Sequence, residues 1–203
     1  MFPLAEGPGE LASRRVLAAR ERVLAAVPHA LDVVPGLASL GVHFDPAATD
    51  AAALRAAVEA ALDAPGPGET AAGSGGASGG RTHTLPTRFD GTDLGRVAAG
   101  AGLPEARAVE AFTEPTYTVG AIGFLPHFPY LLGLDPRLAT PRLPSPRTRV
   151  PAGSVGIGND QAGVYPRESP GGWNLIGTTD PGLLEAIKPG DAVRFEAPSG
   201  GFV

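Results

Sequence analysis

Residues 117–180 read YTVGAIGFLPHFPYLLGLDPRLATPRLPSPRTRVPAGSVGIGNDQAGVYPRESPGGWNLIGTTD, and they carry the clearest indication of the fold class. It contains several short apolar or alternating runs, and each run is bounded by glycine or proline. Short strands separated by such turn signals predict a closed or nearly closed antiparallel β-barrel. Downstream, Pro189-Gly190-Asp191 forms a turn signal before a last predicted strand, AVRFEA.

Upstream of this stretch, the sequence predicts one more strand and two short helices. The strand covers residues 83–89, and the helices lie around residues 93–99 and 104–112. Before them, residues 64–80 read APGPGETAAGSGGASGG, with seven glycines and a single charge. A core cannot be built from such residues, so we expect a flexible linker there and a domain boundary.

The first 63 residues predict a small α/β domain. An apolar stripe at helical spacing indicates a helix over residues 11–27. Two strands, residues 30–34 and 38–44, follow, joined by the turn dipeptide Pro35-Gly36. A second helix begins at Thr49 or Asp50 and ends near residue 62. Residues 81–90 have two interpretations: part of the barrel domain (residues 81–203), or a strand that completes the N-terminal sheet.

The composition excludes several classes of function. The chain has 203 residues, a net charge of −5 and no cysteine, so thiol nucleophiles and disulfides are excluded. Its apolar runs are far shorter than the roughly 20 residues of a membrane helix. We therefore expect a cytoplasmic protein that binds neither nucleic acid nor membrane. Its four histidines are isolated in sequence, so no metal site is expected, and no sequence motif identifies a catalytic residue.

The segment GFLPHFPY, residues 123–130, is rich in aromatic residues and proline. Proline fixes φ and lacks a backbone donor, so the segment predicts a rigid loop. Two interpretations remain open. Either Phe124, Phe128 and Tyr130 form the wall of an apolar groove, or the loop plugs one end of the barrel.

Three arginines follow in TPRLPSPRTR, residues 140–149. Arg147 and Arg149 are two residues apart, so in an extended chain both guanidiniums leave on the same face. With Arg142, they suit a carboxylate or phosphate that is gripped by bidentate hydrogen bonds. The alternative is that they pair with nearby acids, although residues 136–159 contain four arginines and no acid.

Two later features bear on the same groove. The Gly153-Ser154 pair could offer backbone N–H groups to an anion. Trp173, the only tryptophan in the chain, either anchors the core or contacts a ligand.

The elements GFLPHFPYLL, PRLPSPRTRVPAGSV and QAGVYPRESPGGW stand in the order and spacing of a known family. They resemble the carboxyltransferase subdomain C/D family, which includes the 5-oxoprolinase subunit PxpB, KipI and allophanate hydrolase subunit 1. The resemblance implies an α+β protein with a ferredoxin-like N-terminal domain (residues 1–63) and a cyclophilin-like β-barrel (residues 81–203).

The resemblance also implies a function. The chain would be the small subunit of an ATP-hydrolysing 5-oxoprolinase, a hydrolase that uses ATP with magnesium to open 5-oxo-L-proline to L-glutamate. A larger homologous PxpC-like subunit and a PxpA-like subunit would be its partners, and the chain would be active only in their complex. The alternatives are a KipI-like inhibitor of a sensor histidine kinase and a non-catalytic scaffold subunit.

On this analogy, the site is assigned from residue chemistry. A first group would face the anionic substrate: Arg142, Arg147, Arg149, Ser154 and Gln161. A second group would shape the pocket: Tyr130, Tyr165 and Trp173.

The chain departs from the family at two places. His127 replaces a glycine of the family, and it would either narrow the groove or add a titratable group at its mouth. The family's opening strand, a G-D-x-A-L-L-V pattern, is not recognisable in residues 1–10. We therefore expect a first strand that is incomplete or missing, which leaves a sheet edge uncovered. Three explanations are open: the gene start is misplaced, the domain is degenerate, or the partner covers the edge.

Overall fold

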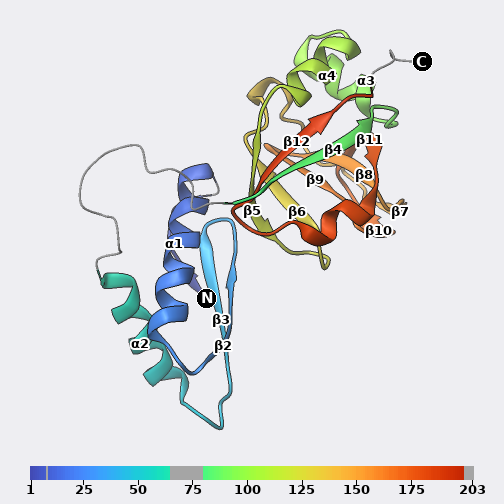
Figure 1. Ribbon diagram of the computed structural model, residues 1–203. Coiled ribbons are helices and arrows are strands. Elements are labelled where there is room, and N and C mark those ends of the chain that lie inside the picture. Colours follow the sequence, from blue (N-terminus) through green and yellow to red (C-terminus); the bar gives the residue numbers. More distant parts are fainter. Residues whose placement is uncertain (8, 65–79, 199–203) are drawn as a thin grey trace. The chain divides into compact units, whose positions relative to one another are not determined.

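The computed structural model describes residues 1–7, 9–64 and 80–198, and the chain divides into two compact units (Figure 1). The first unit is Met1–Gly79 and the second is Gly80–Val203. Of the linker predicted over residues 64–80, residues 65–79 lie outside the described part of the chain.

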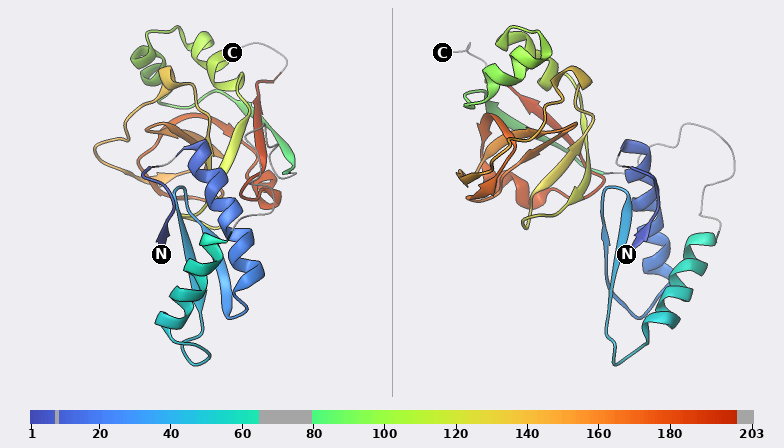
Figure 2. Two further views of the ribbon diagram at one scale, coloured as in Figure 1. Left: turned by 90° about the vertical axis from the view of Figure 1, so that its left-hand side faces the viewer. Right: turned by 180° about the vertical axis from the view of Figure 1, so that it is seen from behind.

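The first unit is a three-stranded antiparallel sheet with two helices against one face (Figure 2). Its elements are β1 (Phe2–Pro3), α1 (Glu10–Ala26), β2 (Ala30–Pro35), β3 (Ser39–Phe44) and α2 (Ala51–Asp63). Val16 and Val23 of α1 pack against Leu40 of β3 and Val58 of α2, and all four are buried. Asp50 caps α2, because its carboxylate accepts hydrogen bonds from the N–H groups of the second and third residues that follow.

The first strand is present but short, so it is incomplete and not missing. Phe2 pairs with Leu40 and Pro3 with Ser39, so the sheet has the order β1-β3-β2. This strand has only two residues, one of them proline, and it therefore shows no alternation that a sequence pattern could detect.

The second unit is a closed barrel of seven strands with two helices at one end (Figure 1). Its order is β11-β4-β12-β5-β6-β9-β8, and β7 and β10 form a separate two-stranded ribbon. The strands are β4 (Thr82–Arg88), β5 (Tyr117–Ile122), β6 (Pro129–Leu132), β7 (Arg147–Val150), β8 (Ser154–Gly158), β9 (Gln161–Val164), β10 (Ser169–Gly171), β11 (Asn174–Thr179) and β12 (Ala192–Glu196). The helices are α3 (Leu94–Ala101) and α4 (Glu105–Thr113), with 3₁₀ turns η1 (Pro136–Leu138) and η2 (Pro181–Ala186).

The barrel is mixed, not purely antiparallel as predicted. β4 and β12 pair in parallel, with His83 opposite Val193, and β4 also pairs with β11. The interpretation that residues 81–90 complete the N-terminal sheet is therefore wrong. Alternation along a strand shows which face is buried, but it does not show which partner the strand has or in which direction it runs.

The helices α3 and α4 cover the main core of the barrel. Phe112 of α4 lies 4.8 Å from Phe195 and 5.4 Å from Tyr117 between ring centroids. The hydroxyl of Tyr117 donates to the Phe112 carbonyl at 2.7 Å, and burial raises the pKa of this tyrosine. Among the helices that the structure describes, none combines the length and the apolar character that a membrane span requires.

Candidate functional site

A pocket of about 280 Å³ opens beside a second, smaller apolar cluster of the barrel unit. Aromatic, proline and glycine residues dominate its lining, which contains one charged side chain. The lining residues are Phe124, Phe128, Tyr130, Arg142, Pro146, Tyr165, Pro170, Gly171, Gly172 and Trp173.

The aromatic residues of the pocket hold one another in place. The ring of Phe128 lies 5.2 Å from that of Tyr165 and 5.4 Å from that of Trp173, in both cases edge to face. Tyr130 adds a contact to Trp173 at 5.9 Å. Such arrangements are favoured by the quadrupoles of the rings, so this wall is rigid before any ligand arrives.

The loop between β5 and β6 carries part of this wall in a strained conformation. The N–H of Gly123 donates to the Phe128 carbonyl at 3.1 Å and closes the loop. Inside it, Phe124 and His127 have φ values of 68° and 67°. Non-glycine residues rarely occupy this region, and they persist in it where the surroundings enforce it. The result is a fixed loop that leaves the Phe124 side chain 60% exposed at the pocket.

Gly158 and Gly163 leave the space that the indole of Trp173 occupies, and we call these two residues its glycine seat. A Cβ atom on Gly158 would lie 2.5 Å from the indole, and one on Gly163 would lie 2.9 Å from it. Both distances are below an ordinary contact, so the indole reaches its place only because these positions lack a side chain.

Arg142 supplies the charge of the pocket. Its guanidinium carbon lies 5.6 Å from the centroid of the Trp173 ring, a cation–π arrangement. Within the described residues it has no acidic partner in ion-pair contact. The guanidinium donors of Arg142 therefore remain available to an anion in the pocket.

Tyr165 contributes a neutral hydroxyl. Burial raises the pKa of Tyr165, and a hydrogen bond from the Trp173 backbone and the charge of Arg142 offset only part of this effect. At neutral pH the phenol is therefore protonated and acts as a hydrogen-bonding group, not as an anion.

Of the three predicted arginines, Arg142 lines the pocket, whereas Arg147 and Arg149 pair with acids, as the alternative interpretation expected. Nη2 of Arg147 lies 2.8 Å from both carboxylate oxygens of Asp93. Nη2 of Arg149 lies 2.7 Å from Oε2 of Glu168 on the surface. The Glu168 carboxylate raises the pKa of Arg149, and the guanidinium of Arg149 lowers the pKa of Glu168. Residues 136–159 contain no acid, but the fold brings Asp93 and Glu168 to these arginines from outside that segment.

Three further predicted residues, Ser154, Gln161 and His127, also lie outside the pocket lining. Ser154 and Gln161 are buried in β8 and β9. The N–H groups of Gly153 and Ser154 donate to the carbonyls of Tyr165 and Pro151, so they are not free to bind an anion. His127 is exposed and does not line the pocket. The fold brings six of the predicted residues together in the lining: Phe124, Phe128, Tyr130, Arg142, Tyr165 and Trp173.

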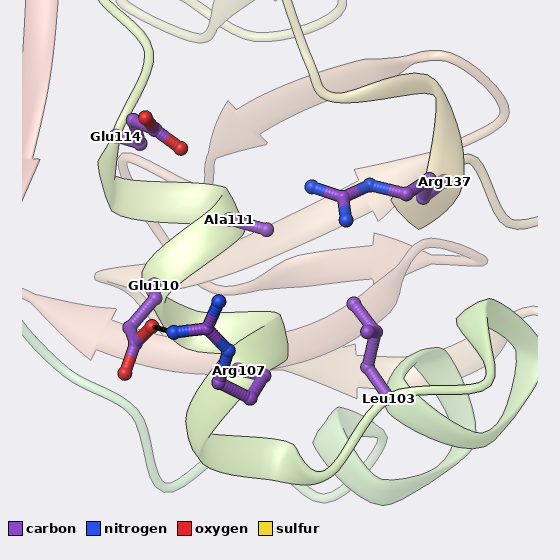
Figure 3. A pocket seen from close by; sticks show the side chains of 6 residues that line it. All are labelled: Leu103, Arg107, Glu110, Ala111, Glu114 and Arg137. Carbon is purple, nitrogen blue, oxygen red and sulfur yellow. Dashed lines mark hydrogen bonds and ion pairs between the residues drawn. The ribbon is translucent and has the colours of Figure 1, made fainter.

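A second hollow, of about 70 Å³, lies between α4 and η1 (Figure 3). Its lining residues are Leu103, Arg107, Glu110, Ala111, Glu114 and Arg137. Arg107 pairs with Glu110, and Arg137 pairs with Asp135 at 2.6 Å. Because its cations are already paired, this hollow is a poor ligand site. No group of three His, Cys, Asp or Glu residues in the described ranges is placed to hold a metal ion.

Comparison with known proteins places this architecture in a family. The chain is 53% identical over 112 residues to a 5-oxoprolinase subunit of Escherichia coli O157:H7, which is 52% of this chain and 51% of that protein. It is 48% identical over 126 residues to a 5-oxoprolinase subunit of Haemophilus influenzae, which is 57% of this chain and 59% of that protein. The match thus spans about half the length of these curated relatives.

Among solved structures, TTHA0988 superposes with a TM-score of 0.79 and 38% identity, over 98% of this chain and 40% of that chain. The family model described as carboxyltransferase domain, subdomain C and D, matches residues 2–188. The chain therefore belongs to the family of carboxyltransferase domains, subdomains C and D.

Proposed function

We propose that this chain is a subunit of an ATP-dependent 5-oxoprolinase, and that its aromatic pocket holds 5-oxo-L-proline. Two observations support the proposal. The relatives in the comparison are named as subunits of 5-oxoprolinase. The pocket itself combines an aromatic wall with the guanidinium of Arg142, which has no acidic partner among the described residues, and this arrangement carries the argument.

The chemistry of the ligand fits this arrangement. 5-Oxo-L-proline is a small lactam ring that bears one carboxylate. The carboxylate suits the guanidinium of Arg142, which can bind it with two parallel hydrogen bonds. The ring suits the faces of Phe128 and Trp173, and the neutral hydroxyl of Tyr165 can hydrogen-bond to the lactam.

The same pocket does not fit ATP with magnesium. A triphosphate calls for several cationic or N–H donors, and magnesium calls for carboxylate oxygens. The lining contains one guanidinium and no carboxylate. We therefore assign the nucleotide and its magnesium to residues outside this pocket, contributed by the partner subunits.

The partners in this proposal are a larger PxpC-like subunit and a PxpA-like subunit. In TTHA0988, the segment that matches this chain is 40% of a longer polypeptide, so the fold occurs joined to further protein. This supports a composite site in which the chain acts only with a partner. The ferredoxin-like and cyclophilin-like assignments of the two units belong to the same proposal.

The test is reconstitution. The chain is co-expressed with the two candidate partners, and conversion of 5-oxo-L-proline to L-glutamate is measured with and without ATP. The proposal predicts ATP-dependent turnover by the complex and none by the chain alone. Turnover by the isolated chain would overturn the composite site, and an inactive complete assembly would overturn the assigned reaction.

A second function is favoured by one observation. Phe124 is largely exposed on a rigid loop, as residues that anchor protein–protein interfaces often are. A KipI-like inhibitor of a histidine kinase would use such a residue. This alternative predicts that the chain slows autophosphorylation of a sensor kinase, and that Phe124→Ala abolishes the effect.

A further inference from the structure

We infer that Asp93 is a positioning residue for the pocket: acting through Arg147, it fixes the place of Trp173 and so sets how tightly the pocket holds a carboxylate ligand. The inference rests on the proposed function for the choice of ligand. The position of Trp173 can be measured without any ligand.

Asp93 is bound tightly to the barrel. It precedes α3 and is 8% exposed. Its N–H donates to the Leu175 carbonyl at 2.8 Å, and its Oδ2 accepts from the N–H of Leu175 at 2.7 Å. Leu175 stands where the pairing of β11 with β8 shifts register. Asp93 therefore supplies the hydrogen bonds that hold this irregular part of β11.

Arg147 connects this carboxylate to the pocket. Its Nη2 binds both oxygens of Asp93, and its Nη1 donates to the carbonyl of Trp173 at 3.3 Å. The backbone is thus held on both sides of Asn174, by Arg147 at residue 173 and by Asp93 at Leu175. This contact fixes the direction in which the indole leaves the chain toward its glycine seat.

Stability alone does not account for this pair. The pair is only partly buried, because 29% of the Arg147 side chain is exposed. Withdrawing charges from water offsets part of their attraction, so such a pair is weak evidence for a stabilising role. What the pair adds is geometry, because a planar guanidinium binds a carboxylate and a carbonyl at once in a fixed arrangement. The chain offers a matched control two residues along β7: Arg149 pairs with the exposed Glu168, and neither lines the pocket.

The test uses Asp93→Asn, which keeps the shape of the side chain and removes its charge. Since Trp173 is the only tryptophan, its emission spectrum and near-UV circular dichroism report its position directly. We expect both spectra to change, and the Kd for 5-oxo-L-proline, measured by Trp173 fluorescence, to rise on the order of tenfold. Glu168→Gln should match the wild type in spectra and Kd.

The double variant Asp93→Asn/Arg147→Gln decides whether Asp93 acts through Arg147. The inference predicts that its effect is no larger than that of the stronger single variant, and additive effects would overturn it. Wild-type spectra in Asp93→Asn would overturn it as well. If Asp93→Asn does not fold, Arg147→Gln alone must change the emission spectrum of Trp173 and the near-UV circular dichroism relative to the wild type. Failure of the wild type to bind 5-oxo-L-proline would refute the proposed function, while the spectra would still decide the role of Asp93.

Discussion

Replacing Gly158 by alanine tests whether the pocket depends on a glycine seat for its tryptophan. The new Cβ atom would lie 2.5 Å from Cε2 of the indole and 2.7 Å from Cδ2 and Nε1. The indole has no room to slide toward Gly163, because it already lies against the backbone there. It must therefore move toward the cavity or press on Phe128.

The expected cost follows from overpacking, which destabilises a well-packed core by about 1–3 kcal/mol. For a unit of this size, each kcal/mol lowers the unfolding midpoint by roughly 3–6 °C, so we expect a fall of about 3–18 °C. The assay is thermal unfolding followed by Trp173 fluorescence, which reports on the barrel unit alone because the chain has one tryptophan. The emission spectrum of the folded variant should also shift.

The matched control is Gly100→Ala in α3. A Cβ atom there would meet nothing within 4 Å, and alanine favours a helix over glycine by about 1 kcal/mol. The midpoint of this variant should rise or stay the same. If Gly158→Ala unfolds at the wild-type midpoint with an unchanged emission spectrum, the reasoning about the seat is refuted.

Two further substitutions test other parts of the structure. Burial alone would raise the pKa of Asp191, but hydrogen bonds from His83 and from two backbone N–H groups outweigh it and lower the pKa. The stability from this carboxylate is full above the ordinary Asp pKa of about 3.9 and is lost as the pH falls through the lowered folded pKa. Asp191→Asn should thus cost about 1–3 kcal/mol in urea unfolding at pH 7 and progressively less in acid, whereas a pH-independent difference would contradict this. His127 has a φ of 67°, which glycine adopts without strain, so His127→Gly should stabilise the barrel by roughly 0.5–1 kcal/mol. His127→Ala keeps a Cβ atom and should not stabilise it. Equal unfolding midpoints for the two variants would count against backbone strain at this position.

Local patterns predicted helices and strands well where the buried residues recur at the regular spacing of a helix or a strand. The alternation in residues 38–44 predicts β3 (Ser39–Phe44), and the apolar stripe predicts α1 (Glu10–Ala26) within a residue at each end. The two-residue strand β1 and the parallel pairing of β4 with β12 were missed. Both depend on contacts between segments far apart in the chain, which a local pattern does not record.

The same limit explains the outcome for the site. The aromatic and proline residues were found because they are rare types gathered in short segments, and they do line the pocket. The sequence could not decide between ligand binding and ion pairing for Arg147 and Arg149, because their acids, Asp93 and Glu168, meet them only in the folded chain. Asp93 itself follows the unremarkable segment RFDGT, and nothing in its sequence neighbours indicates a contact with β7.

In the proposed function, Arg142 holds the carboxylate of 5-oxo-L-proline beside Trp173. The most direct measurement titrates 5-oxo-L-proline into the chain and follows Trp173 fluorescence, for the wild type, Arg142→Gln and Arg149→Gln. We expect saturable binding that Arg142→Gln weakens by about tenfold or more, while Arg149→Gln binds like the wild type. Equal affinity in the wild type and Arg142→Gln, or a loss confined to Arg149→Gln, would contradict it.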